Sequence, residues 1–84
     1  MSGTPIGNYL RRLRFDHDEL SQDSLARAVG ITRQTIVALE GGHYAPSLEL
    51  AMRLALFFNK RVDEVFFWRD PPTLVQLPSS AKPR

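Results

Sequence analysis

The hydrophobic residues of the chain recur at helical spacing in short stretches separated by polar residues, glycine and proline. This pattern predicts a series of short helices. The first is expected to begin at a cap on Ser2 or Thr4, with Pro5 in its first turn, and to end in a polar loop over Phe15–Glu19. Its buried stripe has the spacing i, i+4, i+7 and consists of Ile6, Leu10 and Leu13.

The second and third predicted helices are separated by a turn of only three residues. Ser21 is expected to cap the second helix, and Gly30 to stop it in a left-handed conformation. Thr32 is expected to cap the third, which the glycine pair at 41–42 ends. The residues that should face the core are Leu25, Ala26 and Val29 in the second helix, and Ile36 and Leu39 in the third.

A fourth helix is predicted after a loop through Tyr44 and Pro46, with Ser47 as its cap and Asn59 at its end. A short fifth helix is predicted over Val62–Phe66. The buried side of the fourth helix should be formed by Leu50, Ala51, Leu54, Ala55 and Phe58.

The composition changes after residue 66, which suggests three parts. Residues 1–66 are predicted to form an all-α domain of five helices, and residues 67–77 an aromatic extension. Within the extension, Thr73–Leu77 has strand-like composition and follows two prolines, so a short C-terminal strand is a further expectation. Residues 78–84 are expected to be a flexible tail.

Length and composition agree with one small folded domain. The chain has 84 residues, of which 43% are hydrophobic and none is cysteine. The absence of cysteine excludes disulfides and thiolate metal sites. No apolar run approaches the roughly 20 residues that span a bilayer, and the start does not resemble a signal peptide. We therefore expect a soluble, cytoplasmic protein without a membrane partner.

The net charge of +2 carries little information about partners, because it lies entirely near the C-terminus. Arg69, Lys82 and Arg84 outnumber Asp70 there. Residues 1–68 hold the other eight basic and eight acidic side chains and are neutral. Evidence for a nucleic-acid partner must therefore come from the positions of individual side chains.

The stretch from Gln22 to Glu40 is the most informative part of the sequence. Two short helices joined by three residues must cross at a steep angle. The crossing needs a small residue at the closest approach, which Ala26 provides, and a residue that tolerates positive φ, which Gly30 provides. Apolar anchors are also needed on both helices, and they are Leu25, Val29, Ile31, Ile36 and Leu39.

With these features the chain resembles the Cro/repressor-type helix-turn-helix regulators, also called the XRE family, over roughly Ile6 to Phe66. An apparent extra residue before Ser21 is a departure from the family pattern. The resemblance implies a Cro/repressor-like DNA-binding domain whose third helix enters the major groove. Its further motifs are Ser21-Gln22, Thr32-Arg33-Gln34-Thr35-Ile36, Leu39-Glu40 and Pro46-Ser47-Leu48-Glu49-Leu50-Ala51.

Helical geometry separates two groups of side chains on the third helix, because each residue advances by about 100°. The core anchors Ile36 and Leu39 lie on one side. Arg33 and Gln34 lie on the other, where Arg33 suits guanine and Gln34 suits adenine. The apolar residues that share this outward face, and that suit thymine methyl groups, are Val37 and Ala38.

The resemblance also implies contacts to backbone phosphates beside the groove. Each of these residues can equally be read as an ordinary cap or turn residue. The implied phosphate contacts are Gln22, Thr32, Thr35, Gly42, His43, Tyr44 and Ser47.

In the family, an arginine late in the first helix pairs with the glutamate that ends the third helix. The resemblance therefore implies a structural pair of Arg14 with Glu40. The extra loop residue leaves Arg11 as the other candidate partner.

Other polar and aromatic clusters are weaker signals. The run Asp16–Glu19 lacks a second ligand group, so no metal site is expected. No catalytic triad, glycine-rich phosphate loop or cofactor site is apparent, and an enzyme is not expected. Phe57 and Phe58 could line a ligand pocket, but core packing is the favoured interpretation.

The aromatic run Phe66-Phe67-Trp68 exceeds what one small core needs. Together with Leu74 and Val75 it suggests a homodimer, formed by pairing of edge strands between subunits. The alternative is that the aromatic residues fold back and cover the first and fifth helices.

The leading functional hypothesis is a homodimeric transcriptional regulator, most often a repressor in such families, that binds a pseudo-palindromic DNA site. One alternative is an antitoxin that represses its own operon and binds a toxin through its C-terminal tail. Another is a protein-interaction module on the same fold. No small-molecule ligand is evident.

Overall fold

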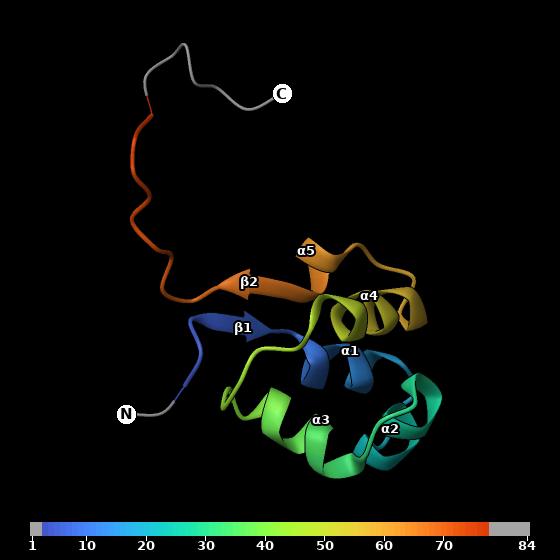
Figure 1. The fold of residues 1–84 in the computed structure, drawn as a ribbon. Helices are drawn as coiled ribbons and strands as arrows, with labels where there is room; N and C mark the ends of the chain where they lie inside the picture. The colour runs from blue at the N-terminus through green and yellow to red at the C-terminus, as the bar shows by residue number, and fades with distance from the viewer. Residues whose placement is uncertain (1–2, 78–84) are drawn as a thin grey trace.

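The computed structural model describes residues 3–77. They contain five helices and a two-stranded antiparallel ribbon (Figure 1). The prediction of an all-α domain with five helices is confirmed. No helix within residues 3–77 is long and apolar enough to cross a membrane. The elements are β1 (Ile6–Asn8), α1 (Leu10–Asp16), α2 (Gln22–Val29), α3 (Arg33–Glu40), α4 (Leu48–Phe57), α5 (Val62–Val65) and β2 (Phe66–Trp68).

The three central helices begin at the expected caps. The side-chain oxygens of Ser21, Thr32 and Ser47 each accept a hydrogen bond from the backbone N–H three residues later. Gly30 ends α2 with φ of 78°, and Asn59 follows α4 with φ of 55°. These local predictions are confirmed.

The predicted start of the first helix is wrong. Residues 6–8 form β1, and α1 begins only at Leu10. The side chain of Asn8 interrupts a helix that would begin before it, because its Oδ1 accepts the N–H of Leu10, 3.1 Å away. Ile6 therefore packs against the core from a strand, and the cap expected at Thr4 instead accepts the N–H of Ile6. The other candidate cap, Ser2, lies outside the described residues.

The start and end of the domain meet in the ribbon. β1 pairs antiparallel with β2, with Gly7 opposite Phe67. A Cβ atom on Gly7 would lie 2.6 Å from two ring carbons of Phe67, so only glycine lets this ring lie against β1. The carbonyl of Pro5 accepts the N–H of Arg69, 2.7 Å away, which extends the contact beyond β2. The packed domain therefore continues past residue 66.

The aromatic run is divided between core and surface. Phe66 is buried within its own chain, and Phe67 packs on Tyr9 with ring centroids 4.6 Å apart. Trp68 is exposed. Phe66 and Phe67 thus fold back, as in the alternative to dimer formation. Phe57 and Phe58 also pack against the core, as expected, and their rings lie beside His17.

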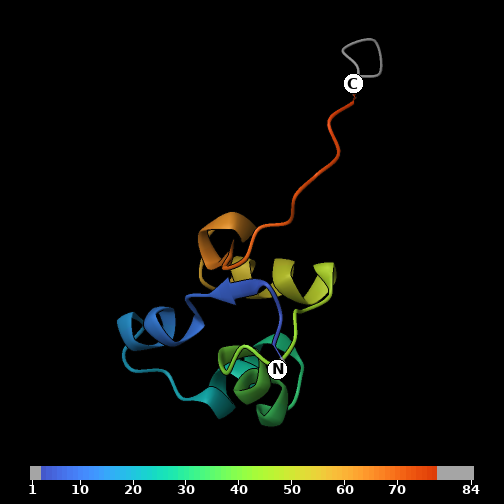
Figure 2. The same cartoon turned by 90° about the vertical axis from the view of Figure 1, so that its left-hand side faces the viewer.

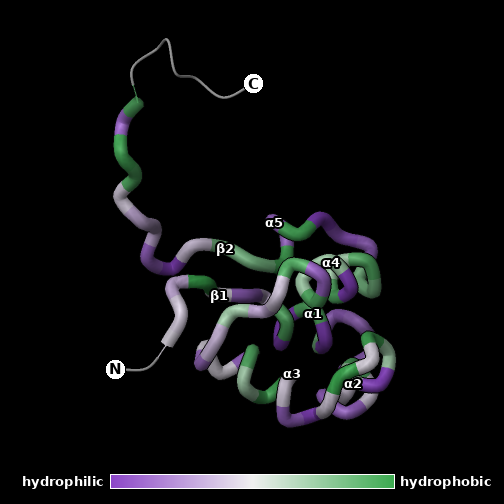
Figure 3. The backbone as a smooth tube through the Cα atoms, in the orientation of Figure 1, coloured by the Kyte–Doolittle hydropathy of each residue, from purple (hydrophilic) through white to green (hydrophobic). Residues whose placement is uncertain are grey.

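Within the single chain, Thr73–Leu77 does not form the expected strand, and the sheet near the C-terminus consists of β1 and β2. Residues 73–77 have no regular secondary structure, because no strand within residues 3–77 pairs with them. Leu74, Val75 and Leu77 are exposed, and Figure 3 shows this hydrophobic segment leading away from the helices. The tail expected at 78–84 lies outside the described residues.

One core joins all the helices. Its fully buried large side chains come from five elements, since each helix presents one apolar stripe to the centre. These side chains are Leu10, Leu25, Ile36, Leu39, Leu54 and Val65.

Candidate nucleic-acid interface

The turn between α2 and α3 is stabilised by local hydrogen bonds and by close packing at the crossing of the helices. The N–H of Ile31 donates to the carbonyl of Ala26, 2.9 Å away, and closes the end of α2. Ala26 itself is buried at the crossing. Thr32, which has an extended backbone conformation, then caps the start of α3. The direction of α3 is therefore fixed within three residues after α2.

The outward face of α3 is accessible. Arg33 and Gln34 are exposed, Val37 is 42% exposed, and Ala38 is half-buried. Ile36 and Leu39 are fully buried on the opposite side of the helix. The side chains expected to read bases thus lie on the surface together, in the first two turns of one helix.

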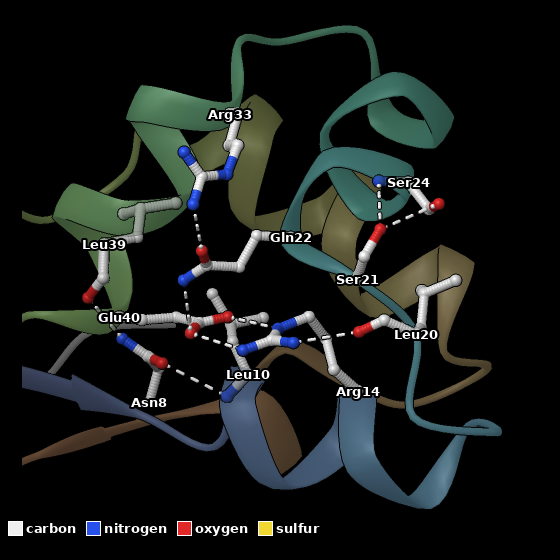
Figure 4. Close-up of polar contacts among 10 residues, drawn as sticks. All are labelled: Asn8, Leu10, Arg14, Leu20, Ser21, Gln22, Ser24, Arg33, Leu39 and Glu40. Carbon is white, nitrogen blue, oxygen red and sulfur yellow. Dashed lines mark hydrogen bonds and ion pairs between the residues drawn. The ribbon is translucent and has the colours of Figure 1, made fainter.

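A chain of hydrogen bonds connects this face to α1 (Figure 4). Arg33 donates to Oε1 of Gln22 at 3.4 Å. The amide nitrogen of Gln22 donates to Oε1 of Glu40 at 3.2 Å. Glu40 also accepts two hydrogen bonds from Arg14. Four side chains from three helices are therefore linked, and Gln22 stands at the centre.

The partner of Glu40 is Arg14. Nε of Arg14 lies 2.6 Å from Oε2 of Glu40, and the second contact measures 2.8 Å. The side chains of Arg14 and Glu40 are only 16% and 9% exposed. Nη1 of Arg14 also donates to the carbonyl of Leu20 at 2.8 Å. Hydrogen bonding to Glu40 raises the pKa of Arg14, although burial alone would lower it.

Arg11 is exposed and lies at the rim of a polar hollow between α1, α2 and α3. Arg33 and Gln22 line the same hollow, together with Asp23 from the first turn of α2. Because Glu40 is neutralised by Arg14, the rim carries two arginines against one aspartate. This hollow suits an anionic group better than a cationic one.

The loop after α3 contains several of the residues expected to contact phosphates. Gly42 has φ of 75°, a conformation that L side chains rarely adopt. His43, Tyr44 and Ser47 follow it and are exposed. Thr35 is half-buried, and its hydroxyl lies 2.9 Å from that of Thr32.

Three residues that no sequence motif connects with α3 hold the end of this helix and the loop after it. Nδ2 of Asn8 donates to the carbonyl of Leu39 at 2.9 Å. The carbonyl of Gly42 accepts the N–H of Thr4 at 3.1 Å and a guanidinium N–H of Arg69 at 3.5 Å. Arg69 also donates to the carbonyl of Thr4. These contacts span 27 to 65 residues, so no local pattern could have revealed them.

The residues considered for a dimer do not form one patch. Phe66 is 8% exposed and belongs to the core, whereas Trp68 is 55% exposed. Leu74 and Val75 are 77% and 86% exposed, in the segment that leads away from the domain. The acidic run at 16–19 does not gather ligands either, and residues 3–77 contain no group of three or more histidine or acidic side chains placed to hold a metal.

The crossed helices, the capped third helix and its exposed polar face define a helix-turn-helix domain of the kind that binds DNA. The helix-turn-helix family model matches residues 10–65, two-thirds of the chain. The protein belongs to this family, in its XRE-type group.

Three relatives illustrate the range of similarity. An uncharacterized HTH-type transcriptional regulator of Methanocaldococcus jannaschii is 43% identical over 63 residues, which cover 75% of this chain and 94% of the relative. The uncharacterized HTH-type transcriptional regulator YgzD of Bacillus subtilis is 43% identical over 56 residues, 67% of this chain and 80% of the relative. The cryptic phage CTXphi transcriptional repressor RstR of Vibrio cholerae is 34% identical over 56 residues, 67% of this chain and 50% of the relative.

Proposed function

We propose that this protein is a sequence-specific DNA-binding transcriptional regulator, and more narrowly a repressor that binds a pseudo-palindromic site as a homodimer. The observation that carries the proposal is the division of α3 into two faces. Arg33 and Gln34 are exposed, while Ile36 and Leu39 on the other side anchor the helix in the core. Such a helix can enter a major groove without uncovering the core.

Base recognition is assigned to the outward face of α3. Arg33 would donate two hydrogen bonds to N7 and O6 of guanine, and Gln34 would pair with N6 and N7 of adenine. Val37 and Ala38 would contact thymine methyl groups. The contact from Arg33 to Gln22 limits the conformations of the guanidinium before DNA arrives.

Phosphate contacts are assigned to the polar residues around α3. Gln22 lies at the N-terminus of α2 and lines the hollow whose rim is positively charged. The remaining candidates lie at caps and in the loop after α3: Thr32, Thr35, Gly42, His43, Tyr44 and Ser47. These contacts would set the register of α3 on the duplex.

The narrower assignment to repression is supported by a relative, RstR, whose name describes a transcriptional repressor. Two-fold symmetry is supported by the size of the domain, because a single small module binds DNA weakly without a partner subunit. The two half-sites would lie one helical turn apart, about 34 Å.

Selection of binding sites from random duplexes, followed by fluorescence anisotropy on the selected site and on unrelated DNA, tests the proposal. We expect Arg33→Ala to weaken binding to the selected site by about 1–3 kcal/mol and to relax the choice at one base pair. Gln22→Ala should weaken binding to both DNAs and, because Gln22 contacts Arg33, also relax that base pair in part.

Arg61→Ala is the matched control, since Arg61 is exposed and precedes α5, on the opposite side of the molecule from α3 (Figure 1). It removes the same charge and should change affinity far less than Arg33→Ala. If the selection yields no preferred sequence, or if both arginine variants lose affinity equally, α3 does not read bases and the proposal is wrong.

A further inference from the structure

Three large apolar side chains form an exposed stripe along α4. Leu48, Met52 and Leu56 are 72%, 56% and 80% exposed. Their spacing of four residues advances by only about 40° at each step, so the three lie in one row. They border an open groove that also includes Ala55 and Lys60. We name Leu48, Met52 and Leu56 the α4 stripe.

The α4 stripe is not required by the fold of its own chain. The buried side of α4 is formed by Ala51, Leu54 and Ala55, which already pack in the core. Single exposed apolar residues are ordinary on soluble proteins, but a continuous row of three indicates a contact surface.

We propose that the α4 stripe is the surface on which a second copy of this chain docks, with the two α4 helices antiparallel across a two-fold axis near Met52. This inference rests on the proposed function in that it supplies the surface for the homodimer. In this arrangement Leu48 of one copy lies against Leu56 of the other, and the row buries itself without any other partner.

Charge complementarity favours a second copy as the occupant. Glu49 and Arg53 lie on the same flank of the stripe and are joined within the helix at 2.7 Å. A two-fold axis perpendicular to two antiparallel helices keeps this flank of both copies on the same side. Glu49 of one copy then approaches Arg53 of the other, and the four charges alternate in sign.

The position of α4 is compatible with DNA binding by both copies. In Figure 2 the yellow-green α4 lies on the side of the domain opposite the blue α1, and the green α3 lies below. A partner beside α4 would leave Arg33 and Gln34 uncovered. The C-terminal extension, by contrast, offers apolar residues without a fixed surface, since Leu74 and Val75 are exposed on a segment without regular structure.

Sedimentation equilibrium of the whole chain without DNA, between about 1 and 100 μM, is the first test. We expect a dimer that Leu56→Glu dissociates, with a dissociation constant raised roughly 100-fold. Val75→Glu is the matched control, because it places the same charge on an equally exposed apolar residue of the extension. It should leave the dimer unchanged. Far-UV circular dichroism checks that both variants are folded, which their exposure predicts.

Cysteine crosslinking is the second test and exploits the absence of native cysteine. Met52→Cys lies near the proposed axis and should form a disulfide-linked dimer on mild oxidation. Phe15→Cys, at a similarly exposed position on α1, should not.

A chain that stays monomeric over the whole range overturns the inference, and so does a dimer that survives Leu56→Glu. A dimer that Val75→Glu dissociates places the extension in the interface and also overturns it. None of these results decides whether α3 reads bases, because selection of a preferred DNA sequence is measured separately. Conversely, a confirmed α4 dimer that selects no sequence would reject the proposed function alone.

Discussion

The ion pair between Glu40 and Arg14 should contribute more stability than any of the other ion pairs within residues 3–77. Glu40→Gln keeps the shape of the side chain but removes its charge and one of its two acceptor oxygens. Two contacts from Arg14 and one from Gln22 depend on that carboxylate. Because the side chains of the pair are only 16% and 9% exposed, water cannot fully replace what is lost.

The expected cost is about 3 kcal/mol, at the low end of the range for breaking a buried pair, because the pair keeps some contact with solvent. For a domain of this size that loss lowers Tm by roughly 12–24 °C. The matched control is Asp16→Asn, which breaks the pair of Arg12 with Asp16, whose side chains are 75% and 54% exposed. It should cost less than about 1 kcal/mol.

Urea and thermal unfolding followed by circular dichroism measure both costs. A double-mutant cycle with Arg14→Met should give a coupling energy of about 2 kcal/mol or more between Arg14 and Glu40. The pKa of Arg14 is raised in the folded protein. The contribution of this arginine to the free energy of unfolding is therefore complete below the ordinary pKa of an arginine and is lost only as the pH rises through the higher, folded-state value. Mild alkali should therefore leave it intact. Equal costs for Glu40→Gln and Asp16→Asn would refute the reasoning.

Substitutions at three further positions test the roles of the glycines and of the helix cap, each by thermal unfolding. Gly7→Ala should cost about 2 kcal/mol, because the new Cβ would lie 2.6 Å from the ring of Phe67 and push the ribbon apart; no loss would show that the strands adjust freely. Gly30→Ala should cost about 1 kcal/mol, because φ is 78° there, and Gly30→Asn should cost less; the reverse order would contradict this reading. Thr32→Ala should cost about 1 kcal/mol through loss of the cap on Thr35, and Thr32→Ser should restore it; a Ser variant as unstable as Ala would exclude capping as the cause.

The central helices could be predicted from the sequence because their signals are local. A cap such as Thr32 acts on a backbone N–H three residues away, and Gly30 acts on its own φ. The exposed face of α3 follows from helical spacing once the cap is known. Each of these predictions needs only the residues within one or two turns.

The ribbon and the polar network could not be predicted in the same way. β1 has three residues, and its partner β2 lies about 60 residues further on. Ile6 sits at a spacing that suits either a helix or this strand, so periodicity alone favoured the wrong element. The link from Arg33 to Gln22 depends on the crossing of two helices, and the pair of Arg14 with Glu40 was expected only from the resemblance to a family.

Contacts that the sequence predicts and contacts that it does not reveal together explain how so short a helix as α3 is held in place. A helix of eight residues such as α3 is not stable alone in water, so its position depends on its neighbours. Gln22 and the cap at Thr32 hold its first turn, and Arg14 holds its last residue, Glu40. The ribbon, which lies outside the region matched by the family model, adds Asn8 on the carbonyl of Leu39.

The two ends of the domain thus meet at the C-terminal end of the helix proposed to read DNA. Thr4 precedes β1 and Arg69 follows β2, and both donate to the carbonyl of Gly42 in the loop after α3. Because one carbonyl accepts from both sides of the ribbon, separation of the strands would release the loop as well. The positions of His43 and Tyr44, which are proposed to contact phosphates, therefore depend on an intact ribbon. A change such as Gly7→Ala should weaken DNA binding in proportion to the stability that it removes.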